Sequence, residues 1–307
     1  MNVIRTATDL KPGDRKVCLA IGVFDGVHLG HQQIIRQTIS DARQHEDIAL
    51  VVTFDQHPNV IVAPDRVPPL IYSPPQKLRA IGSLGADALL MVHFDKPFSE
   101  QSGEAFARKL VNDLGRVQRI CVGADFQFGH QRSGNVALLK TLGAELGFQV
   151  HGLAAVALDG QIVSSTLIRE AVRAGHMDAA SQMLGRSYAL AGRVVAGDRL
   201  GRELGFPTAN LDVSGLVLPP NGVYAVRVLS RRQTHRGLLN IGFRPTLTQA
   251  RPQLRVEAHL LDFTGELYGE ELEVSPLTKL RDERKFASFD ELKAQIQRDL
   301  AAARAAF

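Results

Sequence analysis

The chain has 307 residues, more than one hydrophobic core usually serves, so its length predicts two domains. Hydrophobic residues make up 45% of it and charged residues 22%, a balance that excludes a disordered chain. The net charge of +4 comes without any run of Lys or Arg longer than pairs such as Arg231-Arg232, so nothing predicts nucleic-acid binding. No apolar run approaches the roughly 18 residues of a membrane span, so we expect a cytoplasmic protein without membrane segments.

Residues 17–155 alternate between apolar, strand-like runs and helix-like segments. This alternation predicts a mostly parallel sheet that is covered by helices on both faces. Two cysteines, Cys18 and Cys121, fall within strand-like runs and belong to no Cys-x-x-Cys pair, which indicates buried, inert thiols. The predicted strands are Val17–Val23, Ile48–Phe54, Ala88–Val92, Arg119–Val122 and Phe148–Val156, and the predicted helices lie near 31–45, 76–84, 100–113 and 135–146.

The segment Gly22–His31 follows the first predicted strand and leads into the first predicted helix. A helix N-terminus offers free backbone N–H groups and a partial positive charge, and His28 and His31 would converge there on one anion. This arrangement suggests nucleotide chemistry, although histidines at such places also serve as turn or capping residues. Thr53–Pro58 ends the second strand, so the two segments could share a crevice at the carboxyl edge of the sheet.

After Arg186 the pattern changes to shorter period-two segments, which are typical of an antiparallel barrel or sandwich. We therefore place the domains at 1–186 and 187–307. A last helix is predicted from Ser288, whose hydroxyl can cap it, to about Arg304. The period-two segments lie near 188–196, 223–229, 236–241, 253–262 and 267–274, and the apolar stripe of the last helix, predicted to pack on the core, is Phe289, Leu292, Ile296 and Leu300.

Several common phosphate-binding and metal-binding motifs are absent from the sequence. It contains no Gly-x-x-x-x-Gly-Lys loop, no Gly-x-Gly-x-x-Gly turn, no His-Glu-x-x-His segment and no paired cysteines. Phosphate binding must therefore use another geometry.

Eight segments together resemble the bacterial bifunctional riboflavin kinase/FMN adenylyltransferases, the prokaryotic FAD synthetases, over nearly the whole chain. The resemblance implies a Rossmann-like nucleotidylyltransferase domain with a parallel sheet, followed by a Greek-key-like antiparallel β-barrel with a terminal helix. The segments are Gly22–His31, Val122–Gly134, Val163–Arg169, Gly192–Asn210, Gly222-Val223-Tyr224, Asn240-Ile241-Gly242, Val256-Glu257 and Leu280-Arg281.

For the first half, the resemblance implies transfer of an adenylyl group from ATP to FMN with release of pyrophosphate. The FMN phosphate attacks the α-phosphorus directly, so the protein mainly aligns two anions and neutralises charge. His28, His31 and Arg169 are the implied catalytic residues, although Ser164-Ser165-Thr166 alone would be an ordinary helix cap. The implied ATP-binding residues of this half are Gly22, Phe24, Asp25, Gly26, His28, His31, Ser164, Ser165, Thr166 and Arg169.

The resemblance also marks flavin-side residues in the first half. Asp125 and Phe126 match such positions, and otherwise would be a turn acid and a core aromatic. His57 is either adjacent to the flavin or nucleotide or a structural turn histidine. Family members usually carry Pro where this chain has Gln56, and Gln does not fix φ, so we expect a looser loop there.

For the second half, the resemblance implies riboflavin kinase, which moves the γ-phosphoryl group of ATP to the 5′-hydroxyl of riboflavin. Glu257 is the implied base that accepts the hydroxyl proton. In the run Arg255–Leu261, Arg255, Glu257 and His259 share one face, an alternation that solvent exposure would also explain.

Thr208 and Asn210 match the family's metal and phosphate ligands, and their oxygens suit Mg²⁺. Without the resemblance they would be a turn after Pro207. The glycine-rich run Gly197–Gly205, with Gly197 and Gly201 as ATP-binding residues, would close over the nucleotide as a flap, or be a plain surface loop. Arg281 is a candidate for flavin or phosphate contact, or a solvated arginine.

The residues and the resemblance together predict an enzyme that converts riboflavin to FMN and FMN to FAD, with ATP and Mg²⁺, as a monomer or weak homo-oligomer. Two alternatives remain open. One is another nucleotidylyltransferase of the His-x-Gly-His superfamily with a different phosphorylated acceptor. The other is a flavin or nucleotide sensor without catalysis.

Overall fold

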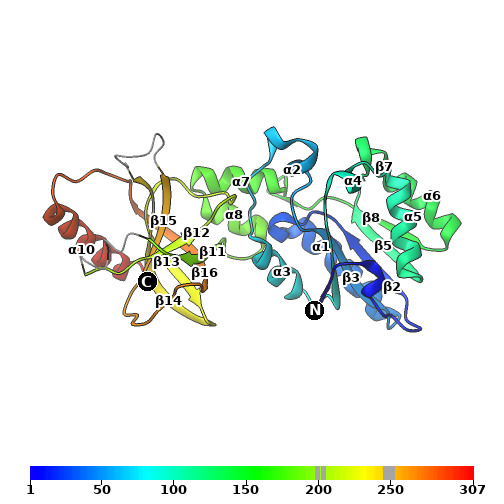
Figure 1. The fold of residues 1–307 in the computed structure, drawn as a ribbon, viewed down its shortest axis with the longest axis horizontal. Helices are drawn as coiled ribbons and strands as arrows, with labels where there is room; N and C mark the ends of the chain where they lie inside the picture. Colours follow the sequence, from blue (N-terminus) through cyan, green and yellow to red (C-terminus); the bar gives the residue numbers. More distant parts are fainter. Residues whose placement is uncertain (198–200, 202–204, 245–252) are drawn as a thin grey trace. The chain divides into compact units, whose positions relative to one another are not determined.

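The computed structural model describes residues 1–197, 201, 205–244 and 253–307, which form two compact units (Figure 1). Residues 1–70 and 74–165 make up the first unit, and residues 71–73 and 166–307 the second. This division by packing falls at the start of a helix, whereas the sequence pattern changes at Arg186. The assignment of functional domains to 1–186 and 187–307 therefore stays a prediction.

The first unit is built on a six-stranded sheet in which every neighbouring pair is parallel, in the order β1-β4-β3-β2-β5-β8. All five residues of β2 are buried, as expected for a central strand with both faces covered. The predicted parallel sheet is confirmed, and the edge strand β1 was not anticipated. The strands are β1 (Asn2–Ile4), β2 (Val17–Ile21), β3 (Ile48–Phe54), β4 (Ala88–Val92), β5 (Val117–Gly123) and β8 (Gln149–Leu153).

Helices cover both faces of this sheet. Cys18 and Ala20 of β2 share a core cluster with residues of α1 and α3, whereas Leu19 and Ile21 share another with residues of α5 and α6. Alternate side chains of one strand thus face different helices. The main helices are α1 (Leu29–Gln44), α3 (Pro74–Gly82), α5 (Gly103–Leu114) and α6 (Val136–Leu146); the short elements are α2 (Asn59–Val62), α4 (Lys96–Ser99), β6 (Gln127–Phe128), β7 (Gly134–Asn135), β9 (Ala157–Leu158), β10 (Gln161–Ile162) and the 3₁₀ turns η1 (Ala7–Asp9), η2 (Asp25–Val27), η3 (Pro64–Arg66) and η4 (His130–Arg132).

The second unit contains a closed antiparallel barrel in the order β11-β12-β15-β14-β13-β16. Of the two architectures that the sequence left open, the structure shows the barrel and not the sandwich. Its non-sequential pairs β12–β15 and β11–β16 give the predicted Greek-key-like connectivity. The elements are α7 (Ser165–Ala174), α8 (Met177–Leu184), β11 (Leu190–Val195), β12 (Ala209–Asp212), β13 (Gly222–Ser230), β14 (Gln233–Arg244), β15 (Gln253–Leu260), β16 (Glu271–Arg281) and α10 (Phe289–Ala305).

The terminal helix α10 lies against the barrel, and its predicted cap is confirmed (Figure 1). The hydroxyl of Ser288 accepts a hydrogen bond from the Glu291 N–H at 3.2 Å. Leu300 packs on the buried cluster around Val223, but Phe289 is 63% exposed. The predicted apolar stripe is thus wrong for its first residue, because the first turn of the helix extends past the core.

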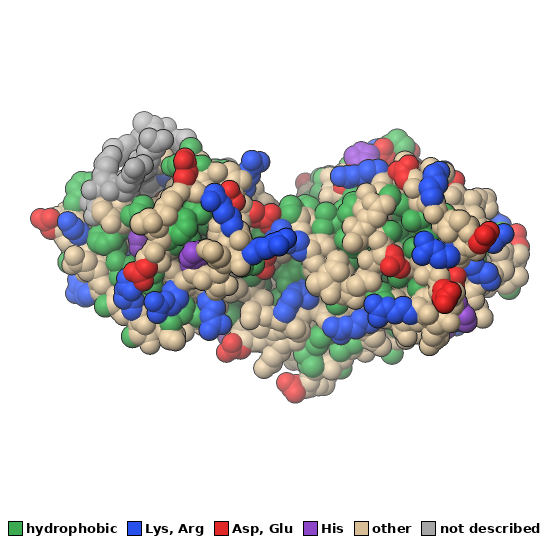
Figure 2. Space-filling view, turned by 90° about the horizontal axis from the view of Figure 1, so that it is seen from below, with side chains coloured by type: hydrophobic (Ala, Val, Ile, Leu, Met, Phe, Trp, Pro, Cys, Tyr) green, Lys and Arg blue, Asp and Glu red, His purple; other side chains and the backbone are tan. Residues whose placement is uncertain are grey.

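The surface shows no concentration of one charge on the face in view. Lys and Arg side chains are interspersed there with Asp and Glu (Figure 2). Across the described part of the chain, no helix has both the length and the apolar character needed to cross a membrane.

Candidate active sites

The His28 and His31 side chains meet at the start of α1. His28 is the N-cap residue and His31 lies in the first turn, and their rings stack with centroids 3.6 Å apart. His28 is 7% exposed. The two imidazoles thus meet at the N-terminus of a helix, as their three-residue spacing predicts, and their binding of one anion there stays a prediction.

The turn that holds these histidines has an unusual backbone. Phe24 and Val27 have φ values of +52° and +44°, and Gly26 has +78°. Left-handed φ values are costly for residues with a Cβ and persist where packing holds them. Phe24 is 1% exposed and packs in the core, so its predicted ATP contact can come only from its backbone. Gly30 leaves space for His28, because a Cβ there would lie 3.3 Å from the His28 Cε1.

The serine segment reaches the same turn through Ser165. Its hydroxyl donates a hydrogen bond to the carbonyl oxygen of Asp25 at 3.1 Å, across 140 residues of sequence. Asp25 is 4% exposed. Arg169 follows Ser165 by four residues on α7, is 7% exposed, and lies on the same side of that helix. Two of the segments that carry the family resemblance are therefore joined by a direct contact.

An aromatic pocket of about 520 Å³ lies beyond the carboxyl ends of β2, β3 and β4. Its phenyl rings contact one another edge to face, for example Phe54 and Phe94 with centroids 5.4 Å apart, and Phe126 stacks on Phe128 at 5.2 Å. Such a wall suits a flat aromatic ligand. The side chains that line it include Ile21, Val23, Phe54, Pro58, Phe94, Phe98, Phe106, Phe126, Phe128 and Arg132.

The predicted flavin-side residues of this half are not all in the pocket. Phe126 lines it, whereas Asp125 is exposed and outside the lining. His57 is also outside, and its Nδ1 accepts a hydrogen bond from the Asn59 N–H at 3.1 Å. That bond is the one expected of a structural turn histidine at the start of α2. The crevice expected between Gly22–His31 and Thr53–Pro58 is confirmed, since Val23, Phe54 and Pro58 line this pocket. Its wall of phenylalanines, spread over 75 residues, gave no local sequence signal and was not foreseen.

Gln56, at the position where the resemblance led us to expect proline, forms a contact of its own. Its Nε2 donates to the Phe94 carbonyl oxygen at 2.6 Å. Phe94 and Pro58 both line the aromatic pocket. A side-chain tether therefore holds the loop against the end of β4 where sequence analysis expected only a loss of rigidity.

Replacing Gln56 by Ala should raise the KM for FMN in FAD formation. The loss of one partly buried hydrogen bond of about 1 kcal/mol corresponds to an increase in KM of about fivefold. Steady-state kinetics of FAD formation measure this change, and riboflavin phosphorylation should be unaltered. Gln44→Ala, at the exposed end of α1, is the matched control. An unchanged KM for FMN in Gln56→Ala would show that the tether does not shape the pocket.

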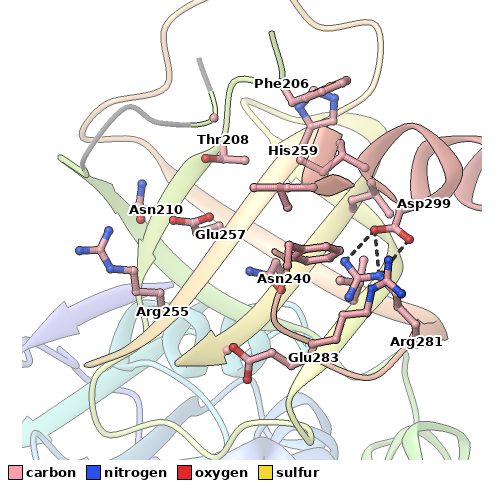
Figure 3. Close-up of a pocket in the computed structure, with 18 of the residues that line it drawn as sticks. Phe206, Thr208, Asn210, Asn240, Arg255, Glu257, His259, Arg281, Glu283 and Asp299 are labelled. Atoms are coloured by element: carbon pink, nitrogen blue, oxygen red, sulfur yellow. Dashed lines mark hydrogen bonds and ion pairs between the residues drawn. The ribbon is translucent and has the colours of Figure 1, made fainter. Parts of the chain in front are cut away.

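A second pocket, of about 390 Å³, lies on the barrel (Figure 3). A row of directly paired residues crosses five neighbouring strands at its floor: Asn210, Glu257, Asn240, Val223 and Arg281. Directly paired residues of antiparallel strands share one face, so all five face the pocket, and all five line it. The alternation read in β15 is confirmed, and its polar face serves this pocket.

Thr208 and Asn210 lie close to Glu257 in this pocket (Figure 3). A Cβ on Gly197 would lie 2.6 Å from the Asn210 Cγ, and one on Gly201 would lie 2.5 Å from the Phe206 carbonyl oxygen. A side chain at position 197 would therefore displace the Asn210 amide, and one at position 201 would displace the Phe206 carbonyl. The backbone at both glycines thus lies close to the corner of the pocket formed by Thr208 and Asn210. The remainder of the predicted flap, 198–200 and 202–204, lies outside the described residues.

His259 holds the adjoining segment. Its Nδ1 lies 2.7 Å from the Pro207 carbonyl oxygen, to which it donates. Thr208 follows Pro207 directly, so the histidine fixes the entry to β12. Asn210 lies in this strand. The sequence alone would favour a turn after Pro207, and the structure has a short barrel strand there instead.

Arg281 is held by an acid that sequence analysis missed. Its Nε and one terminal nitrogen donate to Asp299, at 3.0 Å and 2.9 Å, and Gln295 donates to the same carboxylate at 2.7 Å. Asp299 is 4% exposed. The sequence signal that could have indicated this buried acid was its position directly before Leu300, on the side of α10 that carries the apolar stripe. The solvated alternative for Arg281 is excluded, because this side chain is paired beside the pocket.

A cluster of metal-binding residue types lies outside both pockets. Donor atoms of Asp41, Cys121 and His151 lie within 4.8 Å of one another. Arg119 already pairs with the Asp41 carboxylate at 2.9 Å, and burial raises the pKa of the Cys121 thiol to about 12. A thiol must lose its proton to bind a metal. We interpret the cluster as a buried ion pair, and the predicted free, buried state of Cys18 and Cys121 is confirmed.

A parallel α/β unit with paired histidines at its first helix, together with a barrel that carries a carboxylate between two asparagines, defines a two-site transferase of phosphorus-containing groups. The FAD synthetase family model matches residues 10–167, and the riboflavin kinase family model matches residues 184–307. The chain belongs to the bifunctional riboflavin kinase/FMN adenylyltransferase family. The activity predicted from the resemblance is thereby confirmed.

Relatives share this organisation over their whole length. The chain is 39% identical to the bifunctional riboflavin kinase/FMN adenylyltransferase of Escherichia coli K12, covering 100% of this chain and 98% of that one. The protein of the same description from Pseudomonas fluorescens is 40% identical, with 99% and 97% covered. The crystal structure of a macrolide-efflux protein from Streptococcus pneumoniae has the same fold, with a TM-score of 0.82, 28% identity and 99% of both chains covered.

Proposed function

We propose that residues 1–186 transfer the adenylyl group of ATP to FMN and that residues 187–307 transfer the γ-phosphoryl group of ATP to riboflavin. The observation that carries this division is the presence of two separate pockets, one in each unit. The two family matches, 10–167 and 184–307, do not overlap, and the second begins three residues before the proposed start of the kinase domain at 187.

In the adenylyl site, an FMN phosphate oxygen attacks the α-phosphorus of ATP while the bond to pyrophosphate breaks. No protein nucleophile is required, so alignment and charge neutralisation supply the catalysis. His28 and His31 bind the ATP phosphates at the N-terminus of α1. Ser164, directly before α7, and Ser165, Thr166 and Arg169, in α7, also bind them. The aromatic pocket holds the isoalloxazine ring, with Phe126 in its wall.

In the kinase site, the 5′-hydroxyl oxygen of riboflavin attacks the γ-phosphorus of ATP, and ADP leaves. Glu257 accepts the hydroxyl proton. Its side chain lies between Asn210 and Asn240 on adjacent strands, within the same pocket as Arg281. Arg281, oriented by Asp299, binds flavin or phosphate.

Mg²⁺ fits the corner formed by Thr208 and Asn210. Both side chains offer oxygen donors, the Glu257 carboxylate lies opposite Asn210 in the strand register, and the glycines at 197 and 201 leave the space that a Cβ would fill. When bound, the ion neutralises phosphate charge. Thr208 and Asn210 would hold it, while Glu257 stays available to the hydroxyl proton.

Replacing Asn210 by Ala should raise the Mg²⁺ concentration needed for half-maximal FMN formation. The loss of one oxygen donor weakens metal binding at the barrel. The Mg²⁺ requirement of FAD formation from added FMN should not change, because that reaction uses the other unit. A magnesium titration of both reactions after chelation measures this difference. An equal shift in both requirements would contradict the assignment of the metal corner.

The order of the two reactions is tested by incubating the protein with riboflavin, ATP and Mg²⁺ and separating riboflavin, FMN and FAD over time, and the assignment of each reaction to its residues by the same assay on His31→Ala and Glu257→Ala. FMN should appear first and then fall as FAD rises. Labelled ATP with other phosphorylated acceptors examines the nucleotidylyltransferase alternative. Tight flavin binding without turnover would support the sensor instead.

A further inference from the structure

Lys77 of α3 is a buried lysine next to the adenylyl site. It is 9% exposed, and its Nζ lies 2.9 Å from the Phe54 carbonyl oxygen, 3.3 Å from the Thr53 hydroxyl and 3.5 Å from the Val23 carbonyl oxygen. An ammonium group has three N–H donors, which match these three acceptors. The Thr53 hydroxyl in turn donates to the Val23 carbonyl at 3.0 Å, so the four groups form one network.

This network joins two segments of the site. Val23 belongs to the turn that leads to His28 and His31, and Phe54 ends β3. Val23 and Phe54 both line the aromatic pocket. The Lys77 ammonium therefore links the turn that leads to the histidines with a segment of the pocket wall, and Lys77 itself is not among the residues that line the pocket.

The environment of Lys77 sets its charge. Burial lowers the pKa of the ammonium to about 8, and the nearby carboxylates of Asp25, in η2, and Asp55, after β3, act in the opposite direction. A neutral amine has only two N–H donors and cannot serve all three acceptors. The network is therefore complete only while Lys77 is protonated.

We propose that Lys77 is a positioning residue for adenylyl transfer, and that its ammonium fixes the spacing between the histidine turn and the flavin pocket. This inference rests on the proposed placement of ATP at the histidines and of FMN in the aromatic pocket. Alignment of the FMN phosphate with the α-phosphorus depends on that spacing, and misplacement of reacting groups by about 1 Å can lower a rate about 100-fold.

Replacing Lys77 by Met keeps the length of the side chain and removes all three donors. The kcat of FAD formation should fall by about tenfold or more, with a smaller change in the KM for FMN, because alignment is lost rather than ground-state binding. Riboflavin phosphorylation, catalysed by the other unit of the same molecule, should stay at its original rate and reports that the barrel is folded, while the circular dichroism and thermal unfolding of the variant report on the unit that contains Lys77. Lys109→Met is the matched control, since Lys109 lies on the surface of α5 and pairs with Asp113.

The dependence on pH separates this role from a structural one. FAD formation should decline above about pH 8 relative to riboflavin phosphorylation. In Lys77→Arg, whose guanidinium stays charged, this alkaline decline should be absent. This decline should not reflect unfolding. The pKa of Lys77 in the folded protein lies below its unfolded value of 10.5, so between these two pH values the unfolded chain binds more protons than the folded one. Lys77 therefore makes the free energy of unfolding rise with pH in that range.

Two outcomes would overturn the inference. One is a wild-type kcat of FAD formation in Lys77→Met, and the other is the same alkaline profile in the wild type and in Lys77→Arg. If Lys77→Met does not fold, the comparison of alkaline profiles decides. Failure here is distinguishable from failure of the proposed site, because the latter would also leave FAD formation intact when His31 is replaced.

Discussion

Replacing His31 by Ala should abolish FAD formation while FMN formation continues at its original rate. The His31 imidazole lies at the N-terminus of α1, stacked on His28. In the proposed site it neutralises charge on the transferring phosphate. Loss of one preorganised donor of this kind costs about 10²–10³-fold in kcat. Chromatography of a reaction with riboflavin and ATP should show FMN accumulating without FAD.

The matched control for this variant is His45→Ala. His45 caps the opposite end of the same helix and is exposed, so its removal tests whether any histidine of α1 suffices. Both activities should persist in it. Loss of both activities in a folded His31→Ala protein would contradict the independence of the two sites.

The variant Glu257→Ala should have the reverse effect. FMN formation should fall by about 10²–10⁴-fold, the usual contribution of a general base, whereas FAD formation from added FMN should be unaltered. Glu257 lies in the pocket between Asn210 and Asn240, and no other carboxylate occupies that row of paired residues on the described strands. Initial rates with riboflavin and with FMN as separate substrates measure the two activities.

Glu266→Ala provides the comparison for Glu257, since Glu266 is exposed in the connection between β15 and β16. It should leave both rates unaltered. A slight loss in Glu257→Ala would remove Glu257 as the base. The pocket would then have to supply another proton acceptor, such as Glu283, which also lines it.

The two variants together would also show whether the FMN that the kinase site makes is released before the adenylyl site uses it. A mixture of His31→Ala and Glu257→Ala proteins contains one intact site of each kind. If FMN is released between the reactions, the mixture should form FAD from riboflavin.

Local features of the sequence predicted local features of the structure. The convergence of His28 and His31 followed from their spacing at a helix start, and the Ser288 cap from a hydroxyl before a periodic apolar run. The parallel sheet followed from alternating strand and helix patterns. The histidine pair and the cap each depend on residues within a few positions of one another, and the sheet was predicted from the order of local patterns along the chain, so no knowledge of distant contacts was needed.

Other features depended on which distant segments meet. The sequence left barrel and sandwich open, since pairing partners such as β12 and β15 are about 45 residues apart along the chain. The row from Asn210 through Glu257 to Asn240 depends on strand register, and a shift of one residue would turn those side chains to the other face.

The sequence by itself determined the family, the two activities, the main strands and helices of the first half, and the histidine pair. Tertiary structure alone decided that phenylalanines spread from 54 to 128 form one pocket, that Asp299 holds Arg281, and that Lys77 is buried beneath the nucleotide turn. Local patterns are encoded in neighbouring residues, whereas the burial and charge of a side chain are set by whichever distant segments the fold packs against it.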